Sequence, residues 1–237
     1  MSYAGAVKSA AVVLALLLAT VNAAAQSDGG GMKWWQPVLV VGAIATASLA
    51  DRSVNDWVQD HRTPQSDDLA TIFKYGGEPI VALGIPAATM LAGTIAGRDE
   101  VQRSGGRMLL SVVAAGVATV AVKMTTGRYR PDETDDPYTF KPFSGHDAFP
   151  SGHTTLAFAL ATSLSHELHN GWASAALFTF ATGTAWSRLN DRRHWFSDVL
   201  GGATVGITTA TIVHRHPPKL LAEPNGRGMR LEWRVAF

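Results

Sequence analysis

Six apolar stretches, each long enough to form a helix, dominate this chain and leave little room for any other kind of fold. Apolar and polar residues do not alternate with a period of two in any of them, so strands are not expected to organise the molecule. Glycines stand close together in the last stretch, at Gly201, Gly202 and Gly206, and this spacing suits helices that pack closely. The sequence therefore predicts an all-α fold, a helical bundle of about six helices over residues 37–50, 79–97, 106–124, 153–166, 172–186 and 199–213.

Composition narrows the class of protein. Charged residues make up only 16% of the chain, against about 25% in an average soluble domain, and 46% of the residues are apolar. The mean hydropathy of +0.08 is modest, because the apolar stretches are rich in Ala, Gly and Thr. A membrane-embedded bundle and a soluble Ala-rich bundle both fit, and we expect the former. The net charge of +1 gives no reason to expect a nucleic-acid partner, and the absence of cysteine excludes disulfides and cysteine-bound metals.

The first 25 residues have the three parts of a cleavable export signal. Lys8 supplies the positive region, residues 10–21 the apolar core, and Ala23 to Ala25 a small-residue cleavage site. The apolar core is too short to span a membrane comfortably, so an uncleaved anchor is the less favoured alternative. We therefore expect the mature chain to begin near residue 26. We also expect the protein to lie in the cell envelope of a bacterium.

The mature chain divides into three parts. Residues 26–78 form an N-terminal segment with one short apolar helix, and residues 79–216 form the helical core. Residues 217–237 are a polar C-terminal tail, which ends in the alternating stretch LEWRVAF. That alternation, from Leu231 to Phe237, predicts one short strand.

A polar loop of about 25 residues, from Thr125 to Pro150, interrupts the helical core and is unusually long for a compact helical domain. Three clusters of chemically active residues lie around it: KMTTGRYRP (123–131), PSGH (150–153) and SRLNDRRHWFSD (187–198). Lys123 and Arg130 share one helical face if their helix continues that far. His194 and Asp198 are four residues apart, so on a helix the carboxylate can reach the imidazole.

Each cluster also has an ordinary structural explanation. Lys123 can extend along the helix end toward water, and Ser151 can simply cap the helix that follows it. His194 and Asp198 can form a surface pair. The other polar and charged residues around the loop are expected to be mostly solvated, namely Arg128, Lys141, His146, Asp147, Arg192 and Arg193.

Taken together, the order K-x6-RP, PSGH and SR-x5-H-x3-D resembles the three-part signature of the type 2 phosphatidic acid phosphatase superfamily. That superfamily also includes bacterial class A acid phosphatases and vanadium haloperoxidases, and the helix pattern resembles its lipid phosphatase branch. The resemblance implies that phosphate oxygens are bound by Lys123, Arg130, Ser151, the Gly152 backbone N–H and Arg188.

The resemblance also implies how the reaction runs. His194 would be the nucleophile and form a phosphohistidine, and Asp198 would hold its other ring nitrogen. His153 would protonate the leaving oxygen and then activate water. No metal ion and no cofactor would be required, since three cations already neutralise the phosphate.

The expected substrate is a phosphomonoester or diphosphate of a membrane lipid, such as phosphatidic acid, phosphatidylglycerol phosphate, an isoprenyl diphosphate or lipid A. Trp195 and Phe196 either lie at the membrane interface beside a lipid chain or pack in the core. Because residues 37–50 are shorter than the roughly 20 residues of a span, we expect five spans in the inner membrane and an active site facing the periplasm.

Three rival functions remain from the sequence. A soluble periplasmic acid phosphatase would share every catalytic residue but would act on small phosphomonoesters. A vanadate-dependent haloperoxidase would share the anion site. A non-catalytic membrane protein could bind lipid phosphates with the cations alone.

Overall fold

The computed structural model describes residues 35–217, 219–222 and 229–232, and the predicted export signal lies outside them. The described residues form eight α-helices, one short 3-10 helix and two short strands. These elements are α2 (Trp35–Ser48), α3 (Asp51–Asp60), α4 (Pro64–Lys74), η1 (Tyr75–Gly77), α5 (Pro79–Ile95), α6 (Asp99–Thr126), α7 (Gly152–Leu168), α8 (Gly171–Asn190), α9 (Phe196–Arg215), β1 (Lys219–Ala222) and β2 (Met229–Glu232).

The predicted all-α fold is confirmed. Each of the six expected stretches forms a helix, namely α2 and α5 to α9. Two further helices, α3 and α4, lie in the N-terminal segment, where only the short apolar helix of residues 37–50 was expected. Both are too polar to stand out as apolar stretches, but α4 has a clear start signal. The side chains of Thr63 and Ser66 form a capping box around Pro64, and this arrangement favours the first helical turn.

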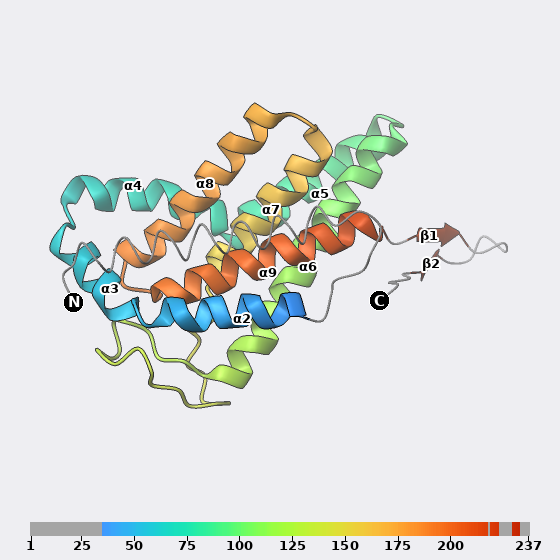
Figure 1. The fold of residues 1–237 in the computed structure, drawn as a ribbon. Helices are drawn as coiled ribbons and strands as arrows, with labels where there is room; N and C mark the ends of the chain where they lie inside the picture. Colours follow the sequence, from blue (N-terminus) through green and yellow to red (C-terminus); the bar gives the residue numbers. More distant parts are fainter. Residues whose placement is uncertain (1–34, 218, 223–228, 233–237) are drawn as a thin grey trace.

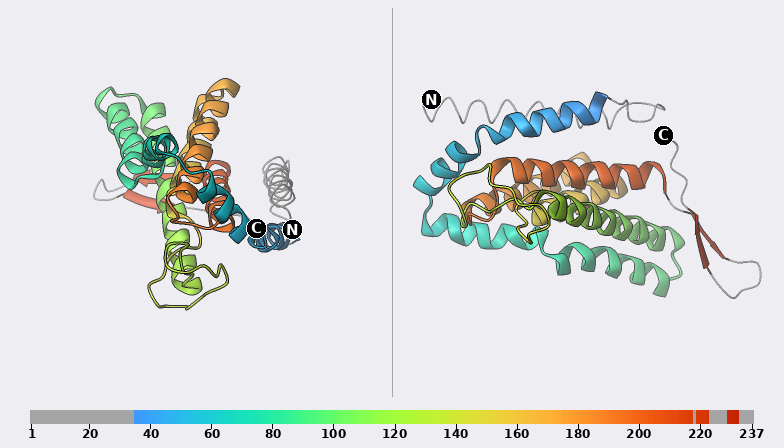
Figure 2. Two further views of the ribbon diagram at one scale, coloured as in Figure 1. Left: turned by 90° about the vertical axis from the view of Figure 1, so that its left-hand side faces the viewer. Right: turned by 90° about the horizontal axis from the view of Figure 1, so that it is seen from below.

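Helix α7 lies at the centre of the bundle and contacts α5, α6, α8 and α9. Helix α5 runs beside α6, and α2 lies along α9 (Figures 1 and 2). Two apolar clusters on α7 hold this arrangement. Ala159 and Leu160 pack with Val112 and Ala115 of α6, whereas Phe158 packs toward α8 and α9. Burial of these apolar side chains from both sides fixes the position of α7.

Glycines on α9 allow α7 to approach it closely, as their spacing suggested. A Cβ atom on Gly202 would lie 2.5 Å from the Ser151 carbonyl oxygen, and one on Gly206 would lie 2.5 Å from the Thr155 carbonyl oxygen. Real Cβ atoms do not come so near to backbone atoms. The start of α7 can therefore rest against the first turns of α9 only because these positions are glycine.

The C-terminal tail contains a small antiparallel ladder. Strand β1 pairs with β2 in a register that places Lys219 opposite Glu232. The strand expected from the LEWRVAF alternation thus begins two residues earlier, at Met229, and residues 233–237 lie outside the described part.

The helices that could cross a membrane are fewer than expected. By length and composition, α6 and α9 qualify among the described residues, and α2 with α3 and α4 with α5 qualify if each bent pair is one span. These pairs bend by 51° and 45°. By this measure α7 and α8 do not qualify, and residues 37–50 combine with α3, whereas the sequence led us to expect five spans.

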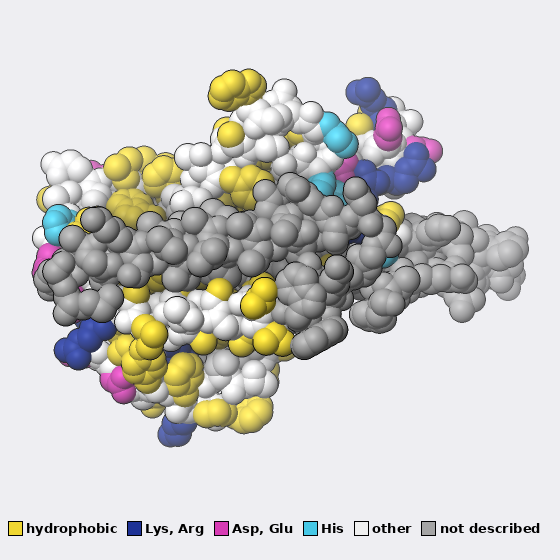
Figure 3. Space-filling model, viewed as in Figure 1, with side chains coloured by type: hydrophobic (Ala, Val, Ile, Leu, Met, Phe, Trp, Pro, Cys, Tyr) yellow, Lys and Arg dark blue, Asp and Glu magenta, His cyan; other side chains and the backbone are white. Residues whose placement is uncertain are grey.

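Apolar side chains nevertheless cover much of the outer surface. Ile80 and Ile95 on α5 are 82% and 78% exposed, and Val117 on α6 is 66% exposed. Figure 3 shows charged side chains gathered at the two ends of the helices, with mainly apolar and uncharged ones between them. An apolar surface of this extent suits contact with lipid.

Candidate active site

The three sequence clusters meet at one end of the bundle. Lys123 lies near the end of α6, the PSGH cluster begins α7, and Arg188 lies near the end of α8. His194 precedes α9, and the Ser151 backbone N–H donates to the Asp198 carbonyl oxygen over 2.9 Å. The long loop of residues 127–151 lies at the same end, at the lower left of Figure 1. The fold thus assembles residues that are up to 75 positions apart in the sequence.

His194 is buried and held in one orientation. Its side chain is 4% exposed, and Nδ1 lies 2.7 Å from the Ala148 carbonyl oxygen. A carbonyl accepts hydrogen bonds only, so Nδ1 carries the hydrogen and Nε2 keeps its lone pair. Burial lowers the pKa of His194 to about 4, although Asp198 acts against this change. The imidazole is therefore neutral at neutral pH and presents a nucleophilic nitrogen.

Asp198 lies beside His194 but is not its hydrogen-bond acceptor. Its Oδ2 atom is 3.8 Å from His194 Nδ1 and accepts the Trp195 backbone N–H over 2.7 Å. Its Oδ1 atom accepts from Arg128 over 2.5 Å. Asp198 was expected to hold the ring nitrogen of His194, but in the structure the Ala148 carbonyl makes that hydrogen bond, and the Asp198 carboxylate lies 3.8 Å from Nδ1.

Lys123 and Arg130 do not share a helical face, because their helix does not continue as far as Arg130. Helix α6 ends at Thr126, because Gly127 adopts the left-handed conformation with φ of 54° and lies against the Lys141 carbonyl oxygen. Arg130 therefore approaches from the loop. Both cations still meet at one point, since both contact Asp147.

Asp147 places a carboxylate between these two cations. Arg130 donates to Asp147 Oδ1 from Nε over 2.9 Å and from Nη2 over 2.7 Å. Lys123 Nζ donates to the Asp147 carbonyl oxygen and lies 3.4 Å from Oδ2. Burial alone would raise the pKa of Asp147, but Lys123 and Arg130 outweigh it and hold this pKa below its usual range. Asp147 is thus an internal counter-ion for both of these cations.

Arg188 has an unmet donor. Its side chain is 9% exposed and its Nη1 atom lies 3.3 Å from Asp191 Oδ2. Its Nε atom is buried and finds no hydrogen-bond partner among the described residues. A buried donor on a cation is costly unless a ligand satisfies it, so this guanidinium suits an anion.

The start of α7 offers further donors. Ser151 is the N-cap residue, but its side chain makes no capping hydrogen bond, which contradicts the simple capping explanation. Its hydroxyl accepts from the Thr154 hydroxyl over 2.9 Å and can donate its own proton to an anion. A Cβ atom on Gly152 would lie 3.8 Å from Lys123 Cε, so the Lys123 side chain passes beside the helix start. Helix N-termini favour anions at such positions.

His153 has a partner that the sequence did not indicate. Its Nε2 atom lies 3.4 Å from Glu78 Oε1, and both side chains are 33% exposed. A Cβ atom on Gly77 would lie 2.4 Å from the His153 carbonyl oxygen, so η1 rests directly against the start of α7. This contact brings Glu78, from the N-terminal part of the chain, to the imidazole.

The structure corrects the expectation for Arg128 and decides between the two alternatives for Trp195. Arg128 is not solvated but 2% exposed, and it binds carboxylates from α3 and α9. Trp195 does not lie at a membrane interface, because it is 1% exposed and its Nε1 donates to the Tyr129 carbonyl oxygen over 2.9 Å. Phe196 packs partly buried beside Leu200.

We compared the chain with protein families and with known proteins. The PAP2 superfamily matches residues 104–221 of the chain, about half its length. The chain is 34% identical over 195 residues to a lipid A 1-phosphatase of Porphyromonas gingivalis, an alignment that covers 79% of this chain and 40% of that protein. The chain thus spans less than half of this relative.

Two solved structures have a similar fold. The crystal structure of Aquifex aeolicus LpxE matches with a TM-score of 0.54 and 25% identity over 68% of this chain and 93% of that one. A transmembrane PAP2-type phosphatidylglycerolphosphate phosphatase from Bacillus subtilis matches with a TM-score of 0.61 and 22% identity over 76% and 95% of the two chains. The resemblance drawn from the motifs is confirmed, and the chain belongs to the PAP2 superfamily through a domain at residues 104–221.

Proposed function

We propose that this protein is a metal-independent phosphatase that removes a phosphate from a membrane lipid through a phosphohistidine at His194. The observation that carries the proposal is the meeting, at one end of the bundle, of a neutral His194 with three cations and a second histidine. The nucleophile, the anion site and the acid–base group needed for phosphoryl transfer are then all present.

In the first step, Nε2 of His194 forms a bond to phosphorus while the bond from phosphorus to the leaving oxygen breaks. His153 gives its proton to that oxygen, so the lipid leaves as a neutral alcohol or a phosphate ester. Lys123, Arg130 and Arg188 bind the phosphoryl oxygens, with Ser151 and the Gly152 N–H as neutral donors. The imidazole ring becomes a cation, which the Asp198 carboxylate stabilises from 3.8 Å.

In the second step, His153 takes a proton from water as the water oxygen bonds to phosphorus. The bond between phosphorus and His194 Nε2 breaks, and inorganic phosphate leaves. The hydrogen on Nδ1, which the Ala148 carbonyl accepts, stays in place throughout. The ring therefore returns to the tautomer from which it started.

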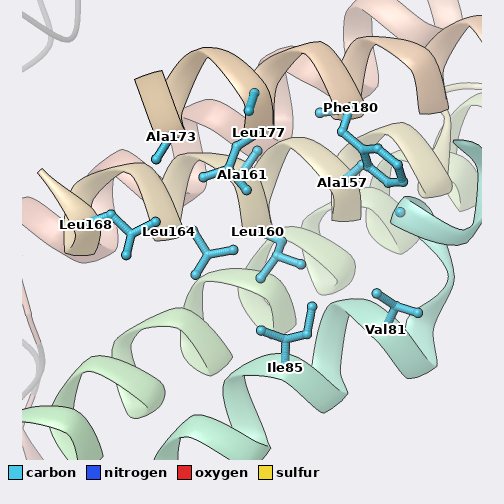
Figure 4. Close-up of a pocket in the computed structure, with 13 residues that line it drawn as sticks. Val81, Ile85, Ala157, Leu160, Ala161, Leu164, Leu168, Ala173, Leu177 and Phe180 are labelled. Atoms are coloured by element: carbon cyan, nitrogen blue, oxygen red, sulfur yellow. The ribbon is translucent and has the colours of Figure 1, made fainter. Parts of the chain in front are cut away.

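An apolar groove supports a lipid as the substrate. It lies between α5, α7 and α8, has a volume of about 420 Å³ and is lined mainly by aliphatic side chains (Figure 4). Its end at Gly76, Val81 and Ala157 adjoins the contact between η1 and His153. Volumes of this size are typical of small-ligand sites, and the lining suits a hydrocarbon chain.

The relative from Porphyromonas makes the 1-phosphate of lipid A the first substrate to test. We place the protein in the inner membrane with the site facing the periplasm. Arg98, Arg103 and Arg107 support this orientation, because they lie at or near the start of α6, the end opposite the site, and basic residues gather on the cytoplasmic side.

The test is phosphate release by detergent-purified protein from lipid A, phosphatidic acid, phosphatidylglycerol phosphate, isoprenyl diphosphates and a soluble monoester, all with EDTA present. Turnover of a lipid that persists in EDTA and is lost in His194→Ala supports the proposal. Preference for the soluble monoester would indicate an acid phosphatase instead. Phosphate binding without any turnover would indicate a non-catalytic binder.

A further inference from the structure

A cluster of buried charges connects the N-terminal segment to the candidate active site. It consists of Asp51 at the start of α3, Arg128 in the long loop, and Ser197 and Asp198 in the first turn of α9. None of these side chains is more than 2% exposed. Buried charges are tolerated only when they are paired and hydrogen-bonded, so the arrangement of this cluster is tightly constrained.

Arg128 donates from all three guanidinium nitrogens. Nη1 donates to Asp198 Oδ1 over 2.5 Å and to the Ser197 hydroxyl over 2.8 Å. Nη2 donates to Asp51 Oδ2 over 2.6 Å, and Nε donates to the Pro137 carbonyl oxygen over 3.0 Å. A planar guanidinium bound on three sides cannot rotate, so it fixes the positions of both carboxylates.

Asp51 binds the first turn of α9 as well. Its Oδ1 atom accepts the Ser197 backbone N–H over 2.7 Å, and its Oδ2 atom accepts the Ser197 hydroxyl over 2.6 Å. A carboxylate at the N-terminus of a helix is favourable for that helix. Asp51 thus holds α3 against the part of α9 that carries Asp198.

The cluster decides which oxygen of Asp198 faces His194. Because Arg128 occupies Oδ1, Oδ2 is the atom that lies 3.8 Å from His194 Nδ1. The cluster holds two carboxylates and one guanidinium, so it has a net charge of −1 when both are ionised. That charge lies beside His194 Nδ1 and raises the pKa of the ring, whereas the cations Lys123 and Arg130 lower it.

We propose that Asp51 and Arg128 are positioning residues for the reaction, which fix the orientation and the charge of Asp198 beside His194. The short helix α3 then belongs to the catalytic apparatus. This inference rests on the proposed function, because only a nucleophilic His194 makes the charge of Asp198 matter for turnover.

The two residues act in distinct ways. Without Asp51, Asp198 is the only carboxylate left in the cluster beside Arg128, and the cluster loses its negative charge. The cation that forms on His194 is then less stabilised, so phosphoryl transfer slows while the phosphate site is unchanged. Without the guanidinium, Asp51 and Asp198 are buried carboxylates with no counter-cation, and one of them takes up a proton.

The test compares Asp51→Asn, Arg128→Lys and Arg128→Gln with the control Asp60→Asn, an exposed residue on the same helix. In Asp51→Asn we expect kcat to fall roughly 10- to 100-fold while KM changes less than about threefold. Arg128→Lys keeps the charge and should retain more activity than Arg128→Gln. Asp60→Asn should behave as the wild type.

A second measurement does not depend on turnover. Titration of the His194 ring by NMR in histidine-labelled protein, assigned with His194→Ala, should show a lower midpoint in Asp51→Asn than in the wild type. An unchanged midpoint, with a kcat that falls only in proportion to the folded fraction, would overturn the inference. If the wild type hydrolyses no ester, the proposed function fails. The titration of His194 still tests the inference in that case, because an unchanged midpoint in Asp51→Asn would show that the charge of the cluster does not act on His194.

Discussion

At the residue scale, Asp147 holds a negative charge between Lys123 and Arg130. Under the proposed function, a substrate phosphate has to compete with this carboxylate for both cations. Replacing the carboxylate with a neutral amide removes the competitor and leaves the cations in place. We therefore expect Asp147→Asn to bind orthovanadate or inorganic phosphate roughly tenfold more tightly, as measured by competitive inhibition.

Asp132→Asn is the matched control for that variant, because Asp132 pairs with Arg193 on the exposed side of the same loop, over 2.8 Å. It should leave inhibition unchanged. Weaker inhibition in Asp147→Asn would contradict the account, since it would mean that Asp147 arranges the cations rather than competing for them.

Burial of His194 also predicts how stability depends on pH. Its pKa is about 4 in the folded protein and 6.5 ordinarily, so the unfolded chain binds a proton that the folded protein does not. The contribution of His194 is complete above pH 6.5 and is lost as the pH falls toward 4, in total about 3 kcal/mol. Thermal unfolding of wild type and His194→Asn between pH 7 and 5 checks this, and equal losses in both proteins would contradict it.

The phosphate-binding and catalytic residues could be proposed from sequence because they stand in three fixed spacings. Arg128 and Asp147 could not be interpreted in the same way. Arg128 is buried by partners 77 and 70 positions away, and nothing in GRYRP distinguishes it from a solvated arginine. The Ala148 carbonyl that orients His194 could not be predicted from the sequence either, because any residue can supply a backbone oxygen.

At the element scale, the contact between α7 and α9 sets the geometry of the site. Gly202→Ala would place a Cβ atom 2.5 Å from the Ser151 carbonyl oxygen and force the start of α7 away from α9. We expect a loss of stability of about 1 to 3 kcal/mol and a fall in kcat beyond that explained by unfolding. Differential scanning measurements together with phosphate release test this.

Gly84→Ala on α5 is the matched control, because no atom lies within 4 Å of its added Cβ. It should be neutral or stabilise the helix by up to about 1 kcal/mol. If both variants behaved alike, the close approach of α7 and α9 would not be what positions the site.

Some helices could be predicted from the sequence and others could not. The six apolar helices were identified because each carries a long apolar stretch. Helix α3, DRSVNDWVQD, buries only one narrow stripe that includes Val54 and Val58. Because most of its residues are polar, it was not recognised as a helix from the sequence. The end of α6 at Gly127 depended on a left-handed conformation that glycine permits but does not require.

At the scale of the whole molecule, the site and the turn between α5 and α6 lie at opposite ends of the helices (Figure 1). If the site faces the periplasm, a cysteine at exposed Asp135 should react with an impermeant maleimide in intact cells, and one at exposed Glu100 should not. The chain has no cysteine of its own, so the background is clean. The reverse pattern would place the site in the cytoplasm.

The candidate membrane spans differ from the five expected from the sequence. Bent pairs such as α2 with α3 combine two stretches, each too short to span alone, and their pairing depends on a bend of 51° that no residue pattern indicates. The number of candidate spans, from two to four, depends on whether each bent pair counts as one span.

The most direct test of the central claim is to look for the phosphoenzyme itself. Protein quenched in alkali during turnover of a lipid phosphate, and then digested, should carry phosphate on the peptide that contains His194. The label should be stable in base, lost in acid and absent from His194→Ala. Turnover without any such peptide, or with phosphate on Ser151 instead, would contradict the account.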